Sequence, residues 1–513
     1  MESRGRAARG TAGVGGRRAV VVGGSMAGLL AARVLAGHFG RVTVVDRDRF
    51  PGRPEHRRGV PQSRHAHGIL PRGQEIIGRL FPGIDADLRA DGAPPAGGKH
   101  LAVVSPAGRL PLGPLRGGEG QGSFASRFLL EWHVRRRLAG YEGVEFLADH
   151  DVTGLVATGD NGRVVGVNVR RRGGGELGFL SADLVVDASG RHSRSPRWLE
   201  ELGYGAPPEE TIESGIGYAS RFYQKPGGWP ADWEGIIVNG RPPGNPRAGL
   251  ILPIENNMWH VTVGGFAGHH PPTDEQGLLQ WAKGLPDPSV YEAIRVAEPV
   301  TPIRAYRTPT NRLRRFERLP RWPENFIVTG DAVCAFNPIY GQGVTVSAMD
   351  AELLERSLGR EGDLGGADPG FAQRFQSELA KIVATPWTIA SSEDLRWGVA
   401  SSGVGRTPTT RLIHRYTDLV LRRAVKDPRV ARVYWDVVGM VAPSRALFGR
   451  DVLPGVLSEA LEGVVSAFGE KRPVPDEDLA LSQEAIDALR ARPAFRFGGR
   501  TMANGAGGQR VGR

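Results

Sequence analysis

The feature that most limits how this chain can fold is the glycine-rich segment Gly23–Gly28, which lies between two different hydrophobic patterns. The short apolar run Ala19–Val22 precedes it, and the longer apolar run Leu29–Phe39 follows it. A second short, β-branched run, Arg41–Val45, then ends at Asp46. Short strand-like runs on either side of a helix predict a parallel pair, because parallel strands need a crossover connection. The pattern therefore predicts a strand–turn–helix–strand unit at the start of an α/β fold.

The turn of this unit has the composition of a dinucleotide site. It matches G-x-G-x-x-G except that Ser25 replaces the middle glycine. Gly23 would allow unusual dihedral angles, a small residue at 25 lets backbone approach a pyrophosphate, and Gly28 permits close packing of helix on strand. The N-terminus of the helix would offer free N–H groups to phosphate. The alternative is a tight turn without a ligand.

Asp46 strengthens the dinucleotide interpretation. It ends the next strand 18 residues after Gly28, near the ~20 expected for a carboxylate that binds a ribose hydroxyl. An acid at this position favours an unphosphorylated ribose, as in FAD or NAD, but the adjacent Arg47 leaves the point open.

Composition narrows the function classes. The chain has 513 residues, of which 40% are hydrophobic and 24% charged, as in globular proteins. Nearly all of the net charge of +11 lies in the two arginine-rich ends, so we expect basic tails rather than a nucleic-acid-binding surface. The single cysteine, Cys334, excludes an internal disulfide and a structural zinc site built on several thiolates. We expect no signal peptide and no membrane span, and hence a cytoplasmic location.

The remaining chain changes pattern twice. Alternating segments from about residue 206 predict antiparallel strands, and an α/β pattern returns after about residue 300. Further strand ends carry Asp187–Gly190, Gly330-Asp331 and Gly341–Gly343. Taken singly, each could be a strand that ends in a turn.

In this order and spacing, the motifs resemble those of the flavoprotein monooxygenases typified by p-hydroxybenzoate hydroxylase and squalene epoxidase, over roughly residues 18–360. The resemblance implies a Rossmann-like FAD-binding domain interrupted by an antiparallel-sheet substrate domain, with a mainly helical C-terminal region. The expected divisions are a tail at 1–17, FAD-binding parts at 18–205 and 301–365, the substrate domain at 206–300, helices at 366–485 and a tail at 486–513.

The same resemblance assigns roles in cofactor binding. Arg57, in Arg57-Arg58-Gly59, and Arg127 would contact the flavin diphosphate, and Asp331 the ribityl chain. Pro338 and the helix N-terminus after it would face the isoalloxazine ring, where a positive helix end stabilises negative charge on reduced flavin. The expected FAD-binding residues are Gly23, Gly24, Ser25, Met26, Ala27, Gly28, Asp46, Arg47, Arg57, Arg127, Asp331, Pro338, Gly341, Gln342, Gly343 and Val344.

A narrower resemblance links the chain to bacterial epoxidases of polyether polyketide precursors. The segments that show this resemblance are Arg57–His67, Asp331–Pro338 and the helical segment after residue 370. Related hydroxylases share these features. His65 and His67 could lie beside the flavin or the substrate mouth, with His65 as a substrate-binding residue. The alternatives are a packing or solvent-facing role, or a metal site for which the sequence offers no third ligand. Tyr218, Phe222 and Trp259 are expected in the core of the middle sheet, with a substrate-facing wall as the alternative.

The resemblance implies that NADPH or NADH reduces FAD, that O2 adds at flavin C4a, and that the hydroperoxide oxidises a hydrophobic small molecule. An alkene needs no base, whereas a phenol needs a deprotonating relay, and no dedicated acid–base pair is evident in the sequence. The alternatives are an aromatic hydroxylase, a flavin halogenase (although W-x-W-x-I-P is missing), a prenyl-chain reductase and a non-catalytic FAD-binding protein. The sequence leaves substrate, stereochemistry, NADH versus NADPH and oligomeric state open.

Overall fold

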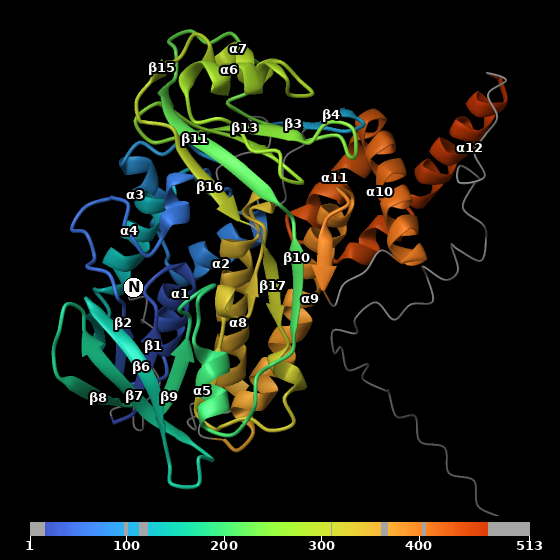
Figure 1. The fold of residues 1–513 in the computed structure, drawn as a ribbon. Helices are drawn as coiled ribbons and strands as arrows, with labels where there is room; N and C mark the ends of the chain where they lie inside the picture. The colour runs from blue at the N-terminus through green and yellow to red at the C-terminus, as the bar shows by residue number, and fades with distance from the viewer. Residues whose placement is uncertain are drawn as a thin grey trace, which may run out of the picture.

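The computed structural model describes residues 16–96, 101–111, 122–308, 310–360, 368–402 and 407–469. Figure 1 shows one sheet at the lower left and a second sheet at the top, with long helices between them and further helices on the right. Apart from residues 16 and 17, the two expected tails lie outside the described residues.

The α/β core predicted from the glycine-rich unit is a five-stranded parallel sheet in the order β18-β9-β1-β2-β5. Val21, Val186 and Ile327 are fully buried in it, as expected for strands covered on both faces. Helices α1 and α8 pack against each other beside this sheet. The carboxyl ends of β1, β2 and β18 meet at one edge, where ligands bind in sheets of this kind. The bounds are β1 (Arg18–Val22), α1 (Met26–Leu35), β2 (Arg41–Val45), β5 (Val144–Leu147), β9 (Leu184–Asp187), β18 (Phe326–Val328) and α8 (Gly343–Arg360).

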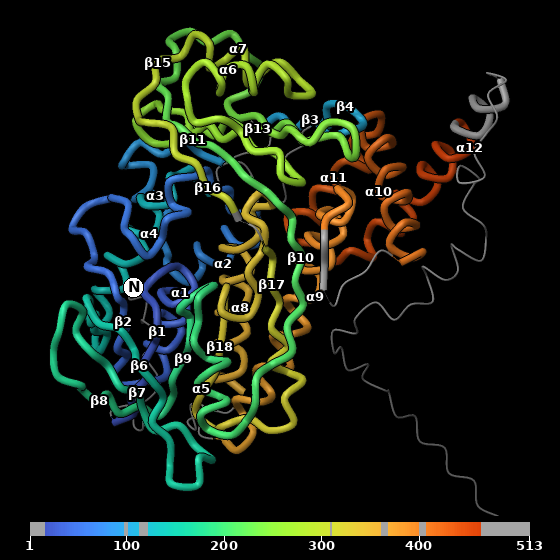
Figure 2. Tube along the Cα trace, viewed as in Figure 1, coloured from blue at the N-terminus to red at the C-terminus, as the bar shows by residue number. Residues whose placement is uncertain are grey.

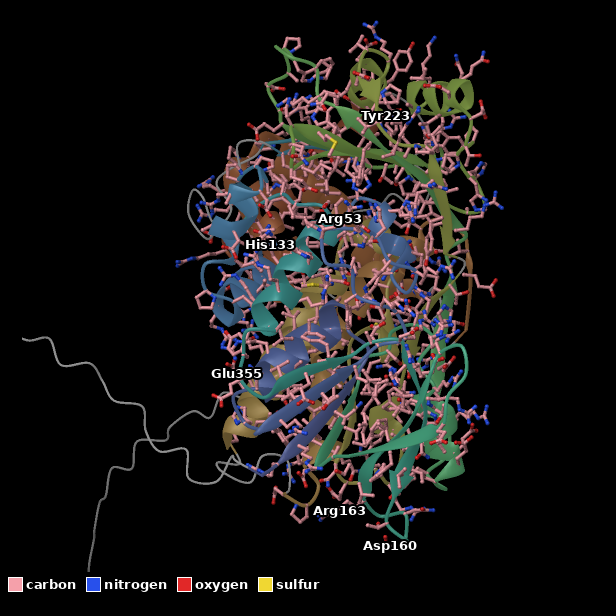
Figure 3. All side chains as sticks on the ribbon, turned by 90° about the vertical axis from the view of Figure 1, so that its left-hand side faces the viewer. Arg53, His133, Asp160, Arg163, Tyr223 and Glu355 are labelled. Carbon is pink, nitrogen blue, oxygen red and sulfur yellow. The ribbon has the colours of Figure 1, made fainter. Side chains whose placement is uncertain are left out.

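Smaller elements complete this lobe. A three-stranded antiparallel sheet, β6-β7-β8, lies at the end where Figure 3 labels Asp160 and Arg163. Tyr223, on the second sheet, is labelled at the opposite end. The bounds are η1 (Pro61–Arg64), α2 (Pro71–Leu80), α3 (Ile84–Ala90), α4 (Arg127–Leu138), β6 (His150–Ala157), β7 (Val164–Arg171), β8 (Leu177–Ser181) and α5 (Ser195–Glu201).

The second sheet is larger than expected. It has eight strands. Seven follow the order β15-β11-β14-β13-β12-β3-β4, and the eighth, β16, also pairs with β11. Strands β3 and β4 come from before residue 206, and β3 pairs with β12 in parallel, so this sheet is neither confined to 206–300 nor wholly antiparallel. Helices α6 and α7 cover its outer face. The bounds are β3 (Leu101–Ser105), β4 (Gly108–Leu110), β11 (Ile216–Gln224), β12 (Gly235–Val238), β13 (Arg247–Ile254), β14 (Met258–Gly265), α6 (Glu275–Lys283), α7 (Ser289–Ile294), β15 (Glu298–Pro299) and β16 (Arg304–Thr308).

A fourth sheet, in the order β19-β17-β10-β20, and the C-terminal helices complete the fold. In Figure 2 the strands β10 and β17 run side by side along α8, and they pair antiparallel. The predicted helical C-terminal region is confirmed, and α10 packs on the β3–β4 hairpin. Within the described residues, no helix is both long and apolar enough to cross a bilayer. The bounds are β10 (Glu209–Glu213), β17 (Asn311–Arg314), η2 (Phe316–Arg318), η3 (Gly330–Ala332), β19 (Cys334–Ala335), η4 (Pro338–Tyr340), α9 (Phe371–Leu395), β20 (Ala400–Ser402), α10 (Pro408–Lys426), α11 (Pro428–Val438), η6 (Ser444–Phe448) and α12 (Leu453–Gly469).

Candidate functional site

The turn between β1 and α1 has the geometry of a phosphate cradle. Gly23 has φ +102°, which favours glycine, and its N–H donates to Val45 O at 2.8 Å. A Cβ added at Gly28 would lie 1.8 Å from Gly23 O, so helix and turn pass too closely for any side chain. Within the described part of the chain, Ser25 makes no side-chain capping bond to the first turn of α1. The N–H groups of that turn are therefore free to bind an anion.

A buried charge cluster stands beside the turn. Asp46 Oδ2 accepts from Gly24 N at 2.7 Å, so the predicted ribose carboxylate lies at the turn. The Arg57 guanidinium contacts three carboxylates: Asp46 at 3.2 Å, Asp48 at 3.1 Å and Glu131 at 2.7 Å. It also donates to Gly24 O at 2.9 Å. Arg57 is thus placed between the ribose carboxylate and the phosphate cradle.

Glu131 organises the second arginine of this cluster. Its Oε2 lies 2.7 Å from Arg127, four residues earlier on α4, and Arg127 also donates to Ser25 Oγ at 2.9 Å. Burial favours the neutral form of Glu131, yet Arg127 and Arg57 outweigh this effect and lower its pKa. Glu131 is therefore ionised at neutral pH and holds both arginines that were expected at the diphosphate. The expected neighbour Arg47 is exposed to solvent.

The Gly330-Asp331 motif meets the glycine-rich turn directly. A Cβ added at Gly330 would lie 2.7 Å from the Cβ of Ala27, so the end of β18 touches the first turn of α1. Asp331 follows, and its Oδ1 lies 3.8 Å from the Cβ position of Gly343, the first residue of α8. Burial raises the pKa of Asp331, while Arg191 and Arg127 oppose that shift.

These contacts form a continuous strip from the phosphate cradle to the start of α8. Gly341 has φ +64°, and a Cβ there would lie 3.3 Å from Gly68 O. Among the described residues, buried Gln342 Oε1 has no hydrogen-bond partner, and Val344 is half-buried. A flavin dinucleotide bound along this strip would have its diphosphate at the β1–α1 turn and its ring at Gly341–Val344. When bound there, FAD would supply redox chemistry that the chain's own side chains lack.

A large cavity adjoins the α8 end of the strip. Its volume is about 1490 Å³, and most of its lining residues are apolar or glycine. The lining comes from His65–Pro71, from the inner face of the second sheet, from the Pro338–Gln342 turn and from helices α9, α10 and α11. Typical ligand pockets are roughly 300–1,000 Å³, so this cavity can take a large apolar molecule.

His65 lies on the wall of this cavity. Its Nδ1 is 2.8 Å from Ser220 Oγ, and its ring packs edge-on against Tyr218 at 4.7 Å between centroids. Burial, with the neighbouring His67, Arg64 and His56, lowers the pKa of His65 to about 3. Burial likewise lowers the pKa of His67 to about 4. Both imidazoles are neutral and weakly basic at pH 7.

We expect His65 to oppose folding in acid. The pKa of His65 in the folded state lies below the unfolded value of 6.5. The stability that His65 contributes is therefore complete above pH 6.5 and is lost as the pH falls toward 3. At pH 5 the loss in unfolding free energy should be about 2 kcal/mol. NMR of histidine-labelled protein should show a resonance, identified by its loss in His65→Asn, that titrates at least two pH units below 6.5. A midpoint near 6.5 would contradict this environment.

The two other aromatic candidates lie on opposite faces of the sheet. Phe222 faces inward, 4.3 Å from the His260 ring. Trp259 is fully buried on the outer face, against Trp229 and Trp233. The alternation of β14 explains this difference, since residue 259 and residue 260 point to opposite faces. A substrate-facing role for Trp259 therefore has no support, and its place is in the outer core.

Several site residues escaped the sequence analysis. Glu131 carried a usable signal, because Arg127 and Glu131 are spaced i, i+4 on one helix. Asp350, on α8, gave no such signal in the sequence. It accepts hydrogen bonds from Thr329 Oγ1 at 3.0 Å and from Gly330 N at 2.9 Å. Burial raises the pKa of Asp350 to about 7. Among the described residues, no group of three or more His, Cys, Asp or Glu side chains could hold a metal ion.

Sequence comparison then defines the class of protein. Residues 17–383 match the family model described as FAD binding domain, which is well over half of the chain, so the protein belongs to that flavoprotein family. It is similar to Protein Rv3254 of Mycobacterium tuberculosis, with 34% identity over 390 residues that cover 75% of this chain and 81% of that protein.

Solved structures share the fold at low identity. The flavin-dependent brominase Bmp2 superposes with a TM-score of 0.60 and 16% identity, covering 88% of this chain and 99% of the brominase. PqsL from Pseudomonas aeruginosa, a "probable FAD-dependent monooxygenase", gives a TM-score of 0.53 at 17% identity, and the match covers 74% of this chain and 98% of PqsL. The myxobacterial chondrochloren halogenase CndH gives a TM-score of 0.56 at 18% identity, and the match covers 84% of this chain and 99% of CndH. At such identities the likeness establishes the fold alone.

Proposed function

We propose that this protein is an FAD-dependent monooxygenase that uses NAD(P)H and O2 to epoxidise alkenes of a hydrophobic polyketide or terpenoid. The observation that carries the proposal is the mostly apolar cavity of about 1490 Å³, which reaches from the Pro338–Gln342 turn to the C-terminal helices. A cavity of this size suits a large apolar molecule better than a simple phenol. The narrower resemblance to polyether epoxidases agrees with such a substrate.

The residues of the chain would act by binding and positioning. The β1–α1 turn, Arg57 and Arg127 would hold the FAD diphosphate, and Asp331 the ribityl chain. The N-terminus of α8 would favour negative charge on the ring. The apolar walls would keep water from the reacting oxygen while they orient the alkene. FAD, once bound, would pass electrons from NAD(P)H to O2.

The two histidines of the cavity wall do not supply the base that phenol hydroxylation would need. Phenol hydroxylation benefits from a base near the ring that can remove a proton at neutral pH. His65 and His67 line the cavity, but their lowered pKa values make them weak bases. Aromatic hydroxylation on the same fold is the second candidate. Halogenation is the third, because brominase and chondrochloren halogenase structures share the fold.

The test begins with a visible spectrum of the purified protein, which should show bound flavin. NADPH and NADH are then supplied in air with a polyene, a phenol, or bromide with an aromatic acceptor. We expect reduced-nicotinamide consumption coupled to an epoxide product with the polyene and to hydrogen peroxide with the phenol. Coupled turnover of the phenol or a halogenated product would refute epoxidation. A yellow protein that neither nucleotide bleaches would support a non-catalytic FAD-binding protein.

A further inference from the structure

One buried carboxylate of the C-terminal helices accepts hydrogen bonds from the turn that leads into α8. Asp394 lies one residue before the end of α9 and is fully buried. Its Oδ1 accepts from Tyr340 OH at 2.7 Å and from Asn337 Nδ2 at 3.0 Å. Its Oδ2 accepts from Asn311 Nδ2 on β17. One carboxylate thus connects α9, β17 and the turn that precedes Gly341.

The bonded side chains control the shape of that turn. Asn337 is fully buried, and its own Oδ1 accepts from Ile339 N at 3.2 Å, which caps the short helix η4. Tyr340 immediately precedes Gly341, whose φ of +64° sets the direction of the chain into α8. A shift of Asn337 or Tyr340 would therefore move Gly341–Gly343 relative to the cofactor strip.

Asp394 lies outside the region that carries the family match, which ends at residue 383. The residues around it, Glu393, Arg396 and Trp397, line the large cavity, and Trp397 stacks on Phe266 of the second sheet at 4.6 Å between centroids. The end of α9 therefore contacts both the cavity and the ring-facing turn. Burial raises the pKa of Asp394 to about 6, although bonds from Tyr340, Asn337 and Asn311 oppose the shift. The group is ionised at pH 8 and can accept all three bonds.

We propose that Asp394 is a positioning residue, through which the C-terminal helices fix the Asn337–Tyr340 turn and thereby the placement of Gly341–Gly343 against the flavin ring. This inference rests on the FAD site of the proposed function and is independent of the substrate. Asp394 acts through Asn337 and Tyr340.

The experiment measures FAD affinity and the visible flavin spectrum at pH 8 for wild type and Asp394→Ala. Hydrogen bonds to a charged group contribute enough that their loss should weaken FAD binding by roughly tenfold or more, with a change in the shape of the flavin band. Asp394→Asn keeps an acceptor oxygen for the turn and should restore affinity to within about threefold of wild type. Wild-type affinity and spectrum in Asp394→Ala would overturn the proposal.

The matched control is Asp427→Ala. Asp427 is also a buried carboxylate of the C-terminal helices, but it caps α11 by accepting from Arg429 N at 3.0 Å. This variant should lose stability and keep the wild-type flavin spectrum. The same spectral change in both variants would reduce Asp394 to a structural role and refute the inference.

A double-mutant cycle tests the route through the turn. Asn337→Ala and Tyr340→Phe each remove one donor, and each should weaken FAD binding by itself, which keeps the proposal testable where Asp394→Ala does not fold. If Asp394 acts through them, Asp394→Ala combined with Tyr340→Phe should weaken FAD binding by less than the product of the single effects. Independent effects would contradict the proposed route. Absence of FAD from wild-type protein would refute the cofactor site itself, and this inference with it.

Discussion

Gly28→Ala should abolish FAD binding. The new Cβ would lie 1.8 Å from Gly23 O and 2.9 Å from Gly23 C, and neither backbone atom can move without opening the turn. Overpacking in a core typically costs 1–3 kcal/mol of stability, and an overlap with backbone should cost about 3 kcal/mol or more. The turn must open to relieve this overlap. If the opened turn forfeits about 3 kcal/mol of contacts with the diphosphate, FAD affinity falls at least about 100-fold. The measurement is the flavin content of the purified protein, followed by titration with FAD.

Gly359→Ala is the control for this substitution. Gly359 lies near the exposed end of α8, and a Cβ there meets no described atom within 4 Å. Because alanine is the better helix former, this variant should keep full flavin content and gain up to about 1 kcal/mol of stability. Gly28→Glu adds negative charge at the cradle and should be apo-protein as well. Wild-type flavin content in either Gly28 variant would contradict the placement of the diphosphate at this turn.

The glycine-rich unit was predictable because its constraints are local. The dihedral angle of Gly23, the contact of Gly28 with the turn and the position of Asp46 all follow from a strand, a tight turn and a helix in sequence. The helix expected after Pro338 is found at Gly343–Arg360 for the same reason, since glycines precede it and its apolar residues recur with helical period. The meeting of the Gly330-Asp331 and Gly23–Gly28 segments follows from the parallel pairing of β1 and β18 with β9.

The cavity was beyond prediction because long-range contacts form it. Alternation in Met258–Gly265 separates Trp259 from His260, but it does not say which face meets the cofactor lobe. The parallel pairing of β3 with β12 joins segments more than 130 residues apart, and no local sequence pattern predicts this pairing. Asp394 is one acid in a helix, and only the packing of α9 against α8 and β18 brings it to Asn337 and Tyr340.

Arg57→Met should destabilise the protein strongly, even before any effect on FAD. The Arg57 side chain is 6% exposed and lies between Asp46, Asp48 and Glu131, each of which is also buried. Methionine keeps the apolar stem but removes the charge, so Asp46 and Asp48 would lose their ion pair with Arg57, and Glu131 would keep its ion pair with Arg127. Breaking a buried ion pair costs about 3–5 kcal/mol. The adjacent Arg58 is exposed, and Arg58→Met, as matched control, should change stability by less than about 0.5 kcal/mol.

The pH dependence separates lost charge pairing from lost packing. Without Arg57, the pKa of Glu131 should rise above its unfolded value, since burial then acts with less compensation. An acid whose folded pKa is raised stabilises the fold at low pH and loses that contribution as pH rises. The difference in unfolding free energy between wild type and Arg57→Met should therefore be larger at pH 8 than at pH 5, whereas a packing defect would give the same difference at both. Denaturant unfolding of both variants at the two pH values measures it, and a difference independent of pH would show that the arginine stabilises the cradle by contact rather than by charge.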